Sequence, residues 1–314
     1  MAMAGGLLLA LVGSACSGDD ARSADASEIE ELRNRFDHNR AQWRLPLDEY
    51  RPNSAAQQYL HGFAEDALLA ECLDEEGLAG FPLGDPPAAS ITEGDPSAVG
   101  LSNEGRQLFN VDIAGQAGYH HPLEVFVADI DAYNVSPEEQ AERAAFQALL
   151  AESVDNRAAF DGCLDEVRGD ALPMVDFNLV QSMEQVASET AQQDDDIAEA
   201  AGRWHECMAP QGYPDLPERP DEMPSESVRA DVGIVEEPEG APSAAGSTPS
   251  TREIEVAVFD AECRESSGYS EALYQAEVEA QFHQIAGNEE ELDRVRVAFD
   301  EDLERVQSII AEHQ

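Results

Sequence analysis

The feature that most constrains this chain is a short pattern, Glu-Cys-x4-Gly, that occurs three times. It places Cys72, Cys207 and Cys263 one residue after a glutamate and five residues before a glycine. We expect each cysteine to lie in the last turns of a helix, which the glycine ends in a left-handed conformation. A fourth cysteine, Cys163, shares the sequence Cys-Leu-Asp-Glu with Cys72. The repeat therefore predicts structural links between helix ends rather than a reactive centre.

Four cysteines can pair in three ways, and the sequence alone does not choose among them. We prefer Cys72–Cys163 and Cys207–Cys263, which give one disulfide to each half of the chain. Reactive thiols and a metal site are the alternatives, since His205 lies near Cys207. Zinc sites usually supply ligands in pairs two to four residues apart, and the chain contains no Cys-x2-Cys or His-x3-His. We therefore predict disulfides, with no catalytic residue, no metal ligand and no cofactor assigned.

The charge of the chain restricts the kinds of partner that it can bind. Among 314 residues, 66 are acidic and 18 are basic, and the formal net charge is −48. Nucleic acids and anionic lipid headgroups are repelled by such a field, because binding them requires clustered Lys or Arg. All the basic residues are Arg, and they form no basic patch with interleaved aromatic residues. We therefore expect no nucleic-acid partner.

The N-terminal segment predicts export. Residues 1–16 carry no charged side chain, and their apolar run from Leu7 to Val12 is far shorter than the roughly 20 residues of a membrane-spanning helix. This is typical of a secretory signal. Cys16, preceded by Gly-Ser-Ala, resembles the lipobox cysteine of bacterial lipoproteins, although Gly13 stands where that pattern prefers an aliphatic residue. The resemblance implies lipidation of Cys16 and a membrane anchor on the outer face of the cell membrane, with a secreted form as the alternative.

Apolar periodicity predicts a mainly α fold, a disulfide-stapled helical domain with long Gly/Pro-rich loops. We divide the chain into five segments, taken in order from the N-terminus. These are a signal peptide (1–15), a flexible tether (16–28), a helical body (29–213), a disordered acidic Pro/Ser-rich loop (214–251) and C-terminal helices that pack on the body (252–314).

Two local patterns refine this division. Leu292, Val295 and Phe299 begin an apolar stripe of the C-terminal helix, and we expect Asn288 to cap that helix. Residues 78–135 are rich in Gly and Pro and contain the one fair strand candidate, 123–130. The C-terminal helix is thus the strongest prediction of a single element.

The last third of the chain also resembles a known family, through two cysteine motifs. The matching residues are Trp204, Cys207, Met208, Gly212 and Tyr213, followed by Ala257, Asp260 and Cys263. They are similar to the Trp-x2-Cys-Met-x3-Gly-Tyr and Ala-x2-Asp-x2-Cys motifs of exported lipoproteins of high-GC Gram-positive bacteria. The resemblance implies the location and the pairing of the cysteines, and it implies no activity.

We interpret the other candidate sites as structural. Adjacent His120 and His121 point in different directions on any regular element, so we interpret them as part of a loop. Asp129-x-Asp131 begins like a calcium loop but lacks the later glycine and glutamate. Trp204 and Tyr213 could line a sugar or peptide pocket, but in a helix followed by a cap we interpret them as core and helix-end residues.

Two functional hypotheses follow. The first is a non-catalytic cell-envelope lipoprotein that binds an unidentified envelope partner or acts as a scaffold at the outer membrane face. The alternative is an envelope hydrolase that attacks wall glycan or peptide through carboxylates. A deep pocket with two close carboxylates of perturbed pKa would favour the hydrolase. A filled core with shallow clefts would favour the scaffold.

Overall fold

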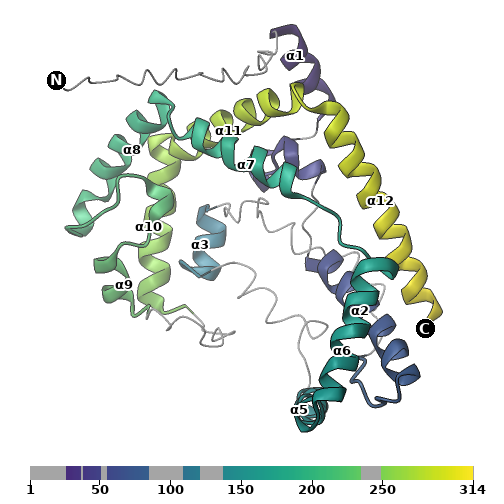
Figure 1. Ribbon diagram of the computed structural model, residues 1–314. Coiled ribbons are helices and arrows are strands. Elements are labelled where there is room, and N and C mark those ends of the chain that lie inside the picture. The colour runs from purple at the N-terminus through teal and green to yellow at the C-terminus, as the bar shows by residue number, and fades with distance from the viewer. Residues whose placement is uncertain are drawn as a thin grey trace, which may run out of the picture.

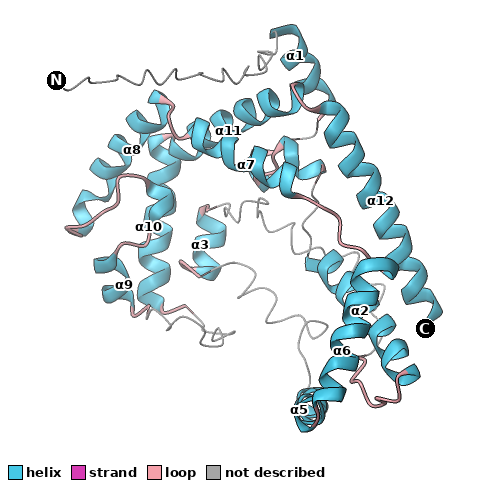
Figure 2. Ribbon diagram, in the orientation of Figure 1, coloured by secondary structure: helices cyan, strands magenta, loops and turns pink. Residues whose placement is uncertain are grey.

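The structure is a computed structural model that describes residues 26–36, 38–50, 55–84, 109–120, 137–234 and 249–313. Within these ranges the chain is helical and contains no strand, and Asn39 and Arg44 form an isolated bridge (Figure 2). The predicted disulfide-stapled, mainly α fold is confirmed. Cys16, the signal peptide, the strand candidate 123–130, His121 and the Asp129–Asp131 pair lie outside the described residues.

Three consecutive helices at the C-terminal end form a frame along which the other elements pack. They are α10 (Thr251–Ser267), α11 (Tyr269–Ala286) and α12 (Glu289–Glu312), and they run along one side, across the top and down the other side (Figure 1). Asn288 occupies the N-cap position of α12, but its side chain donates to the Gln284 carbonyl at 2.8 Å and does not bond to α12. The predicted capping role of this side chain is therefore wrong.

The first lobe gathers on α10. It comprises α3 (Val111–Ala117), α8 (Asp195–Met208) with the short η7 (Ala209–Gln211), and α9 (Glu226–Val232), all of which contact α10 or one another (Figure 1). Small residues of α10, Ala257 and Ala261, are fully buried against Ala114 of α3. Because these side chains are short, the helix axes can approach closely.

The middle of the molecule is built on α11. Here α1 (Ala26–Arg35), η1 (Arg40–Gln42), η2 (Pro46–Glu49) and α7 (Asn178–Ala191) surround an aromatic and aliphatic core. Trp43, Tyr274 and Phe282 are buried in it, and the Trp43 and Tyr274 rings meet edge to face at 5.4 Å. This is the largest of the apolar clusters in the described residues, and it joins the N-terminal and C-terminal parts of the chain.

The second lobe packs on the C-terminal half of α12. It comprises α2 (Ala55–Glu75), α5 (Pro137–Glu152), α6 (Val154–Glu166) and the π-helical turn η6 (Val167–Ala171) that continues α6. One cluster joins α2 to α12 through residues such as Phe63 and Ile309, and another lies among α2, α5 and α6. Among the described helices, none has the length and apolarity that crossing a membrane requires.

The predicted disordered loop is wrong for its first half. Residues 214–234 form η8 (Pro220–Glu222) and α9, and the Ser225 hydroxyl caps α9. Val228 is fully buried against Val256 of α10, and the Arg264 guanidinium donates to the Pro220 carbonyl at 2.6 Å. Partners distant in sequence therefore order a segment whose local composition is typical of a loop. Residues 235–248 lie outside the described part.

Candidate functional site

The four cysteines of the described chain form two disulfides. Cys72 bonds to Cys163 with an S–S distance of 2.01 Å, and Cys207 bonds to Cys263 at 1.97 Å. The Cα atoms lie 5.7 and 5.6 Å apart, within the normal range for disulfides. These are the pairs preferred from the sequence, one in each lobe. Stable disulfides are typical of an oxidising environment.

The glycines of the repeat end their helices as predicted. Gly77, Gly212 and Gly268 have φ angles of +79°, +78° and +78°, a region that residues with a Cβ rarely adopt. Gly169, which follows Cys163, behaves differently, because α6 runs into the π-helical turn η6 and Gly169 lies inside it with no positive φ. Each of the three repeats therefore places a cysteine near a helix end that a glycine with positive φ terminates. Cys163 also forms a disulfide, but no such glycine follows it.

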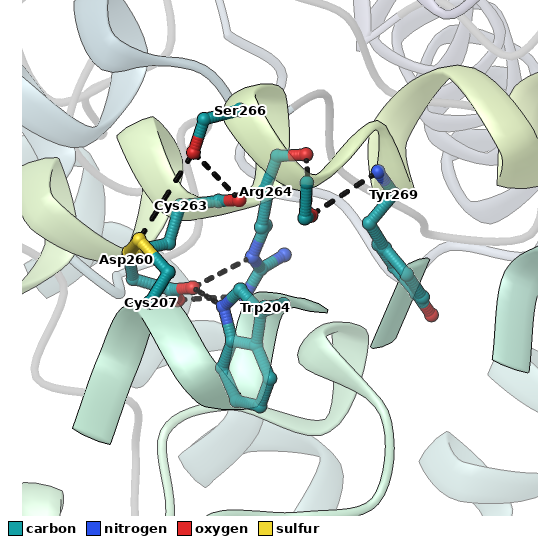
Figure 3. Close-up of a disulfide and its surroundings, with 8 residues drawn as sticks. Trp204, Cys207, Asp260, Cys263, Arg264, Ser266 and Tyr269 are labelled. Atoms are coloured by element: carbon teal, nitrogen blue, oxygen red, sulfur yellow. Dashed lines mark hydrogen bonds and ion pairs between the residues drawn. A yellow bond between two sulfur atoms is a disulfide. The ribbon is translucent and has the colours of Figure 1, made fainter. Parts of the chain in front are cut away.

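Beside the Cys207–Cys263 disulfide lies the candidate site, a polar cluster formed by the buried Trp204, Asp260 and Arg264 and the half-buried Tyr119. The Trp204 indole N–H donates to Asp260 Oδ1 at 2.8 Å, and both side chains are fully buried (Figure 3). Each residue lies three positions before a cysteine of the disulfide, so the bond and the hydrogen bond join the same faces of α8 and α10. The two cysteine motifs of this sequence thus form one two-part clamp.

Arg264 completes the charge balance of the cluster. Its guanidinium donates to Asp260 Oδ1 at 3.0 Å and Oδ2 at 2.8 Å, and it lies 4.2 Å above the centre of the Phe109 ring. Burial lowers the pKa of Arg264, but the charge and hydrogen bonds of Asp260 outweigh that effect, so the pKa is raised. The pair is therefore a buried salt bridge whose charges compensate each other.

Tyr119 brings the end of α3 into the same cluster. Its hydroxyl donates to Asp260 Oδ2 at 3.3 Å, and its pKa is raised, first by burial and then by the charge of Asp260. Its backbone N–H donates to Glu253 Oε1 at 2.8 Å, while His120 Nε2 lies 3.4 Å from Glu253 Oε2. Gly118 has a φ of +59°, and a Cβ there would meet the Glu253 carboxylate, so another residue would strain the backbone and displace that side chain. The predicted loop residues 118–120 thus fix α3 to α10.

A separate open groove lies between α1, the start of α8, and α11. It has a volume of roughly 600 Å³ and is lined by charged side chains. Five carboxylates and two guanidinium groups face it: Asp194, Asp196, Glu199, Glu271, Glu279, Arg33 and Arg203. Arg33 pairs with Glu279, and Arg203 donates to the Ser267 carbonyl at 2.9 Å. None of the buried carboxylates described above lines this groove.

Several of these residues were missed from the sequence. Arg264 could have been found, because Asp260 and Arg264 are four residues apart and lie on one face of a helix. Tyr119 and Glu253 could not, because 134 residues separate them and no local pattern joins them. The sequence therefore indicates pairs within one helix, such as Asp260 and Arg264, but not pairs between elements far apart in the chain.

No family model, curated protein or solved structure matches the chain. The site is therefore interpreted from its geometry. In the part of the chain that the structure describes, no three His, Cys, Asp or Glu side chains are grouped so as to hold a metal ion. Within the cluster, the Trp204 indole, the Arg264 guanidinium and the Tyr119 hydroxyl all donate to Asp260, and the two sulfur atoms beside it are bonded to each other. The arrangement can hold α3, α8 and α10 together, because its polar groups bond to one another.

Proposed function

We propose that this protein is a non-catalytic, lipid-anchored protein of the cell envelope that binds a partner or acts as a scaffold at the outer face of the cell membrane. One observation carries the proposal. The side chains best suited to chemistry, those of Trp204, Asp260 and Arg264, are buried and engage one another beside a disulfide. Groups enclosed in this way stabilise a fold, and a substrate has no access to them.

The open groove supports the same proposal. An acid–base hydrolase needs two carboxylates held around a substrate, with burial or a neighbouring charge tuning one of them. The groove carboxylates lie on an open surface, and Glu279 and Glu271 pair with Arg33 and Arg40. The buried carboxylates Asp260 and Glu253 lie elsewhere and bond to the protein itself. This arrangement suits a charged binding surface better than a hydrolytic centre.

The anchor is the part of the proposal that depends on sequence alone. The first residue of α1, Ala26, lies ten positions after Cys16. Such a segment spans at most about 35 Å, so a lipid on Cys16 would hold the helical domain close to the membrane surface. The two disulfides agree with an oxidising location outside the cytosol.

The resemblance to exported lipoproteins of high-GC Gram-positive bacteria belongs to the proposal as well. Its motif residues include Trp204, Asp260 and both cysteines of the first lobe, which form the clamp between α8 and α10. A motif that encodes a clamp can be shared by proteins that bind different partners. We therefore infer a shared architecture and assign no shared ligand.

The anchor is tested by membrane fractionation of the full chain and of Cys16→Ser in an envelope-bearing bacterial host. We expect the wild type in the membrane fraction, with a diacylglyceryl group on Cys16 in mass spectra of the N-terminal peptide. We expect the variant in the soluble exported fraction or retained with its signal. A wild type that is exported without lipid would contradict the anchor.

The absence of catalysis is tested separately with purified protein and isolated cell-wall material. We expect no release of soluble glycan or peptide above that of a heat-denatured sample. Release that persists in Asp260→Asn but is lost in Glu271→Gln would contradict the proposal, because it would place a hydrolytic centre in the groove.

A further inference from the structure

Each of the two disulfides joins one partly exposed cysteine to one buried cysteine. In the first lobe, Cys263 is fully buried, whereas its partner Cys207 is partly exposed. In the second lobe, Cys163 is buried, with 2% of its surface exposed, and its partner Cys72 is again partly exposed. A molecule in solution can therefore reach Cys207 and Cys72, but the protein covers the other member of each pair.

The position of Cys207 in the fold explains its exposure. It is the second-last residue of α8, and its Sγ lies 4.0 Å from the hydroxyl oxygen of Ser266, an exposed residue near the end of α10 (Figure 3). Cys263 lies one turn before the end of α10 and packs with Trp204 and Met208, which are fully buried. The disulfide thus runs from the surface of the first lobe into its core.

The second lobe repeats this asymmetry in an apolar setting. Cys163 belongs to a cluster of buried side chains that includes Phe146 and Leu150. Cys72, in the last turn of α2, packs against the edge of the same cluster. The two lobes therefore present their disulfides to the solvent in the same way, although the residues around the bonds differ.

This geometry decides which sulfur atom can react. A disulfide is opened when a thiolate attacks one of its two sulfur atoms, and the rate depends on access to that atom. Attack on Cys207 forms a bond between the incoming sulfur and Cys207 Sγ and breaks the bond to Cys263 Sγ. Cys263 keeps the electron pair and takes up a proton from the solvent. The incoming thiol is oxidised to the disulfide level while Cys263 is reduced to a thiol, so no further reagent is needed.

The surroundings of Cys263 make this step slow and easily reversed. The departing thiolate would lie in an apolar cluster, where its charge is poorly solvated. The hydrogen bond between Trp204 and Asp260 lies one turn away on the same helix faces and does not depend on the disulfide. It keeps α8 and α10 aligned, so Cys263 stays close to Cys207 and can attack it to expel the added thiol.

From these positions we propose that Cys207 and Cys72 are the sites at which an external thiol modifies this protein by forming a mixed disulfide. Cys263 and Cys163 are the sulfur atoms released as thiols, and they stay unmodified while the protein is folded. The proposal depends on the two disulfides and on the burial of one sulfur atom in each. It does not depend on the proposed envelope function.

The test is disulfide exchange of the folded full chain with an excess of reduced glutathione. The reaction is stopped with acid, free thiols are alkylated in denaturant, and the peptides are mapped by mass spectrometry. We expect glutathione on Cys207 and Cys72 at least about tenfold more often than on Cys263 and Cys163, because access selects the sulfur atom that is attacked. Equal labelling within either pair, or no glutathione on the folded protein, would overturn the proposal.

The same exchange in unfolding concentrations of urea is the matched control for burial. Both sulfur atoms of each pair are then accessible, so the preference for Cys207 and Cys72 should disappear. A preference that persists in urea would overturn the proposal, because it would come from the local sequence rather than from the fold.

Ser266→Leu tests the assignment of Cys207 with a change outside the buried polar cluster. Since the Ser266 hydroxyl lies 4.0 Å from Cys207 Sγ, a leucine at this position would cover that sulfur atom. We expect glutathione to add to Cys207 several-fold more slowly and to Cys72 at the wild-type rate. Ser308→Leu, at an exposed position of α12, is the matched control and should change neither rate. An unchanged rate at Cys207 in Ser266→Leu would contradict the assignment.

Discussion

The two lobes place a disulfide in the same position between helices but surround it with opposite chemistry. Three residues before each cysteine, on the same helix face, the first lobe has Trp204 and Asp260, which hydrogen-bond to each other. The second lobe has Leu69 and Phe160 in these positions, both within one apolar cluster. A single layout of two helices and a disulfide is therefore completed by a polar clamp in one lobe and by hydrophobic packing in the other.

This difference determines how strictly the packing of each lobe depends on the identity of its side chains. Hydrophobic packing tolerates exchange among apolar residues of similar volume. A buried polar cluster is less tolerant, because each group left without a partner retains its full desolvation cost. The first lobe should therefore respond to substitution in an all-or-none way, and the second lobe in proportion to the volume removed.

Removal of the disulfides should produce the largest effects. With sequence separations of 91 and 56 residues, the chain-entropy model predicts a loss of about 4 to 5 kcal/mol for each Cys→Ala pair. Trp43 and Trp204 both lie outside the second lobe, so tryptophan fluorescence reports on the middle and the first lobe. In urea, Cys207→Ala/Cys263→Ala should lower the fluorescence midpoint.

The other disulfide provides the contrast. Cys72→Ala/Cys163→Ala should act mainly on hydrogen exchange of α2 and α6, with a smaller change in the fluorescence midpoint. If both variants shift fluorescence and exchange equally, the lobes unfold as one unit, and the comparison between them fails.

The buried charge pair should produce the next largest effect. Asp260→Ala should lower the free energy of unfolding by about 3 to 5 kcal/mol, because it leaves the Arg264 charge buried without its partner. Asp260→Leu/Arg264→Met should lose less, since both charges are removed together and the remaining loss is that of the acceptor of the Trp204 N–H and the Tyr119 hydroxyl. The measurement is urea denaturation followed by tryptophan fluorescence and circular dichroism.

The second lobe supplies the comparison for this prediction. Leu69→Ala should cost about 2 to 5 kcal/mol, and a further change at Phe160 should add to the loss rather than recover it. A double variant at Asp260 and Arg264 that is as unstable as Asp260→Ala would show that the first lobe depends on volume too.

The glycines should produce the smallest effects and separate the fourth cysteine from the other three. Gly268→Ala and Gly77→Ala should each cost about 1 to 2 kcal/mol, because both glycines adopt the left-handed conformation. Gly169→Ala should be neutral or stabilising by up to about 1 kcal/mol, since no atom would crowd the added Cβ and φ is not positive. Thermal melting of the three variants tests this. A loss at Gly169 equal to that at Gly268 would contradict the distinction.

The predictable part of the fold is the part that local chemistry determines. Helices with a repeating apolar face, such as the one containing Leu292, and the glycines that end helices need only their neighbours to be recognised. Residues 214–234 were misjudged for the converse reason. Their order depends on Arg264 and on Val256, which lie tens of residues away and leave no trace in local composition.

The same division applies to the candidate site. The cysteines stood out because they recur at a fixed spacing, and Trp204 and Asp260 because they belong to the two motifs that resemble exported lipoproteins. The contacts of Tyr119 with Asp260 and of His313 with Glu71 span 141 and 242 residues, so their pairing is a property of the assembled fold. Periodicity can show which face of a helix is buried, but it cannot show which other helix packs against that face.

The order of the elements along the chain has a consequence for biosynthesis, because the frame follows the helices that pack on it. Tyr119 bonds to Glu253, Glu71 to His313 and Arg33 to Glu279, across 134, 242 and 246 residues. Ribosomes deliver the N-terminus first, at about 5 to 20 residues per second, so α1, α2 and α3 wait for tens of seconds or less before their partners exist. During that interval their apolar faces are exposed, which is the state that chaperones recognise. The tertiary contacts of α1, α2 and α3 with the frame therefore form only after the frame has been synthesised.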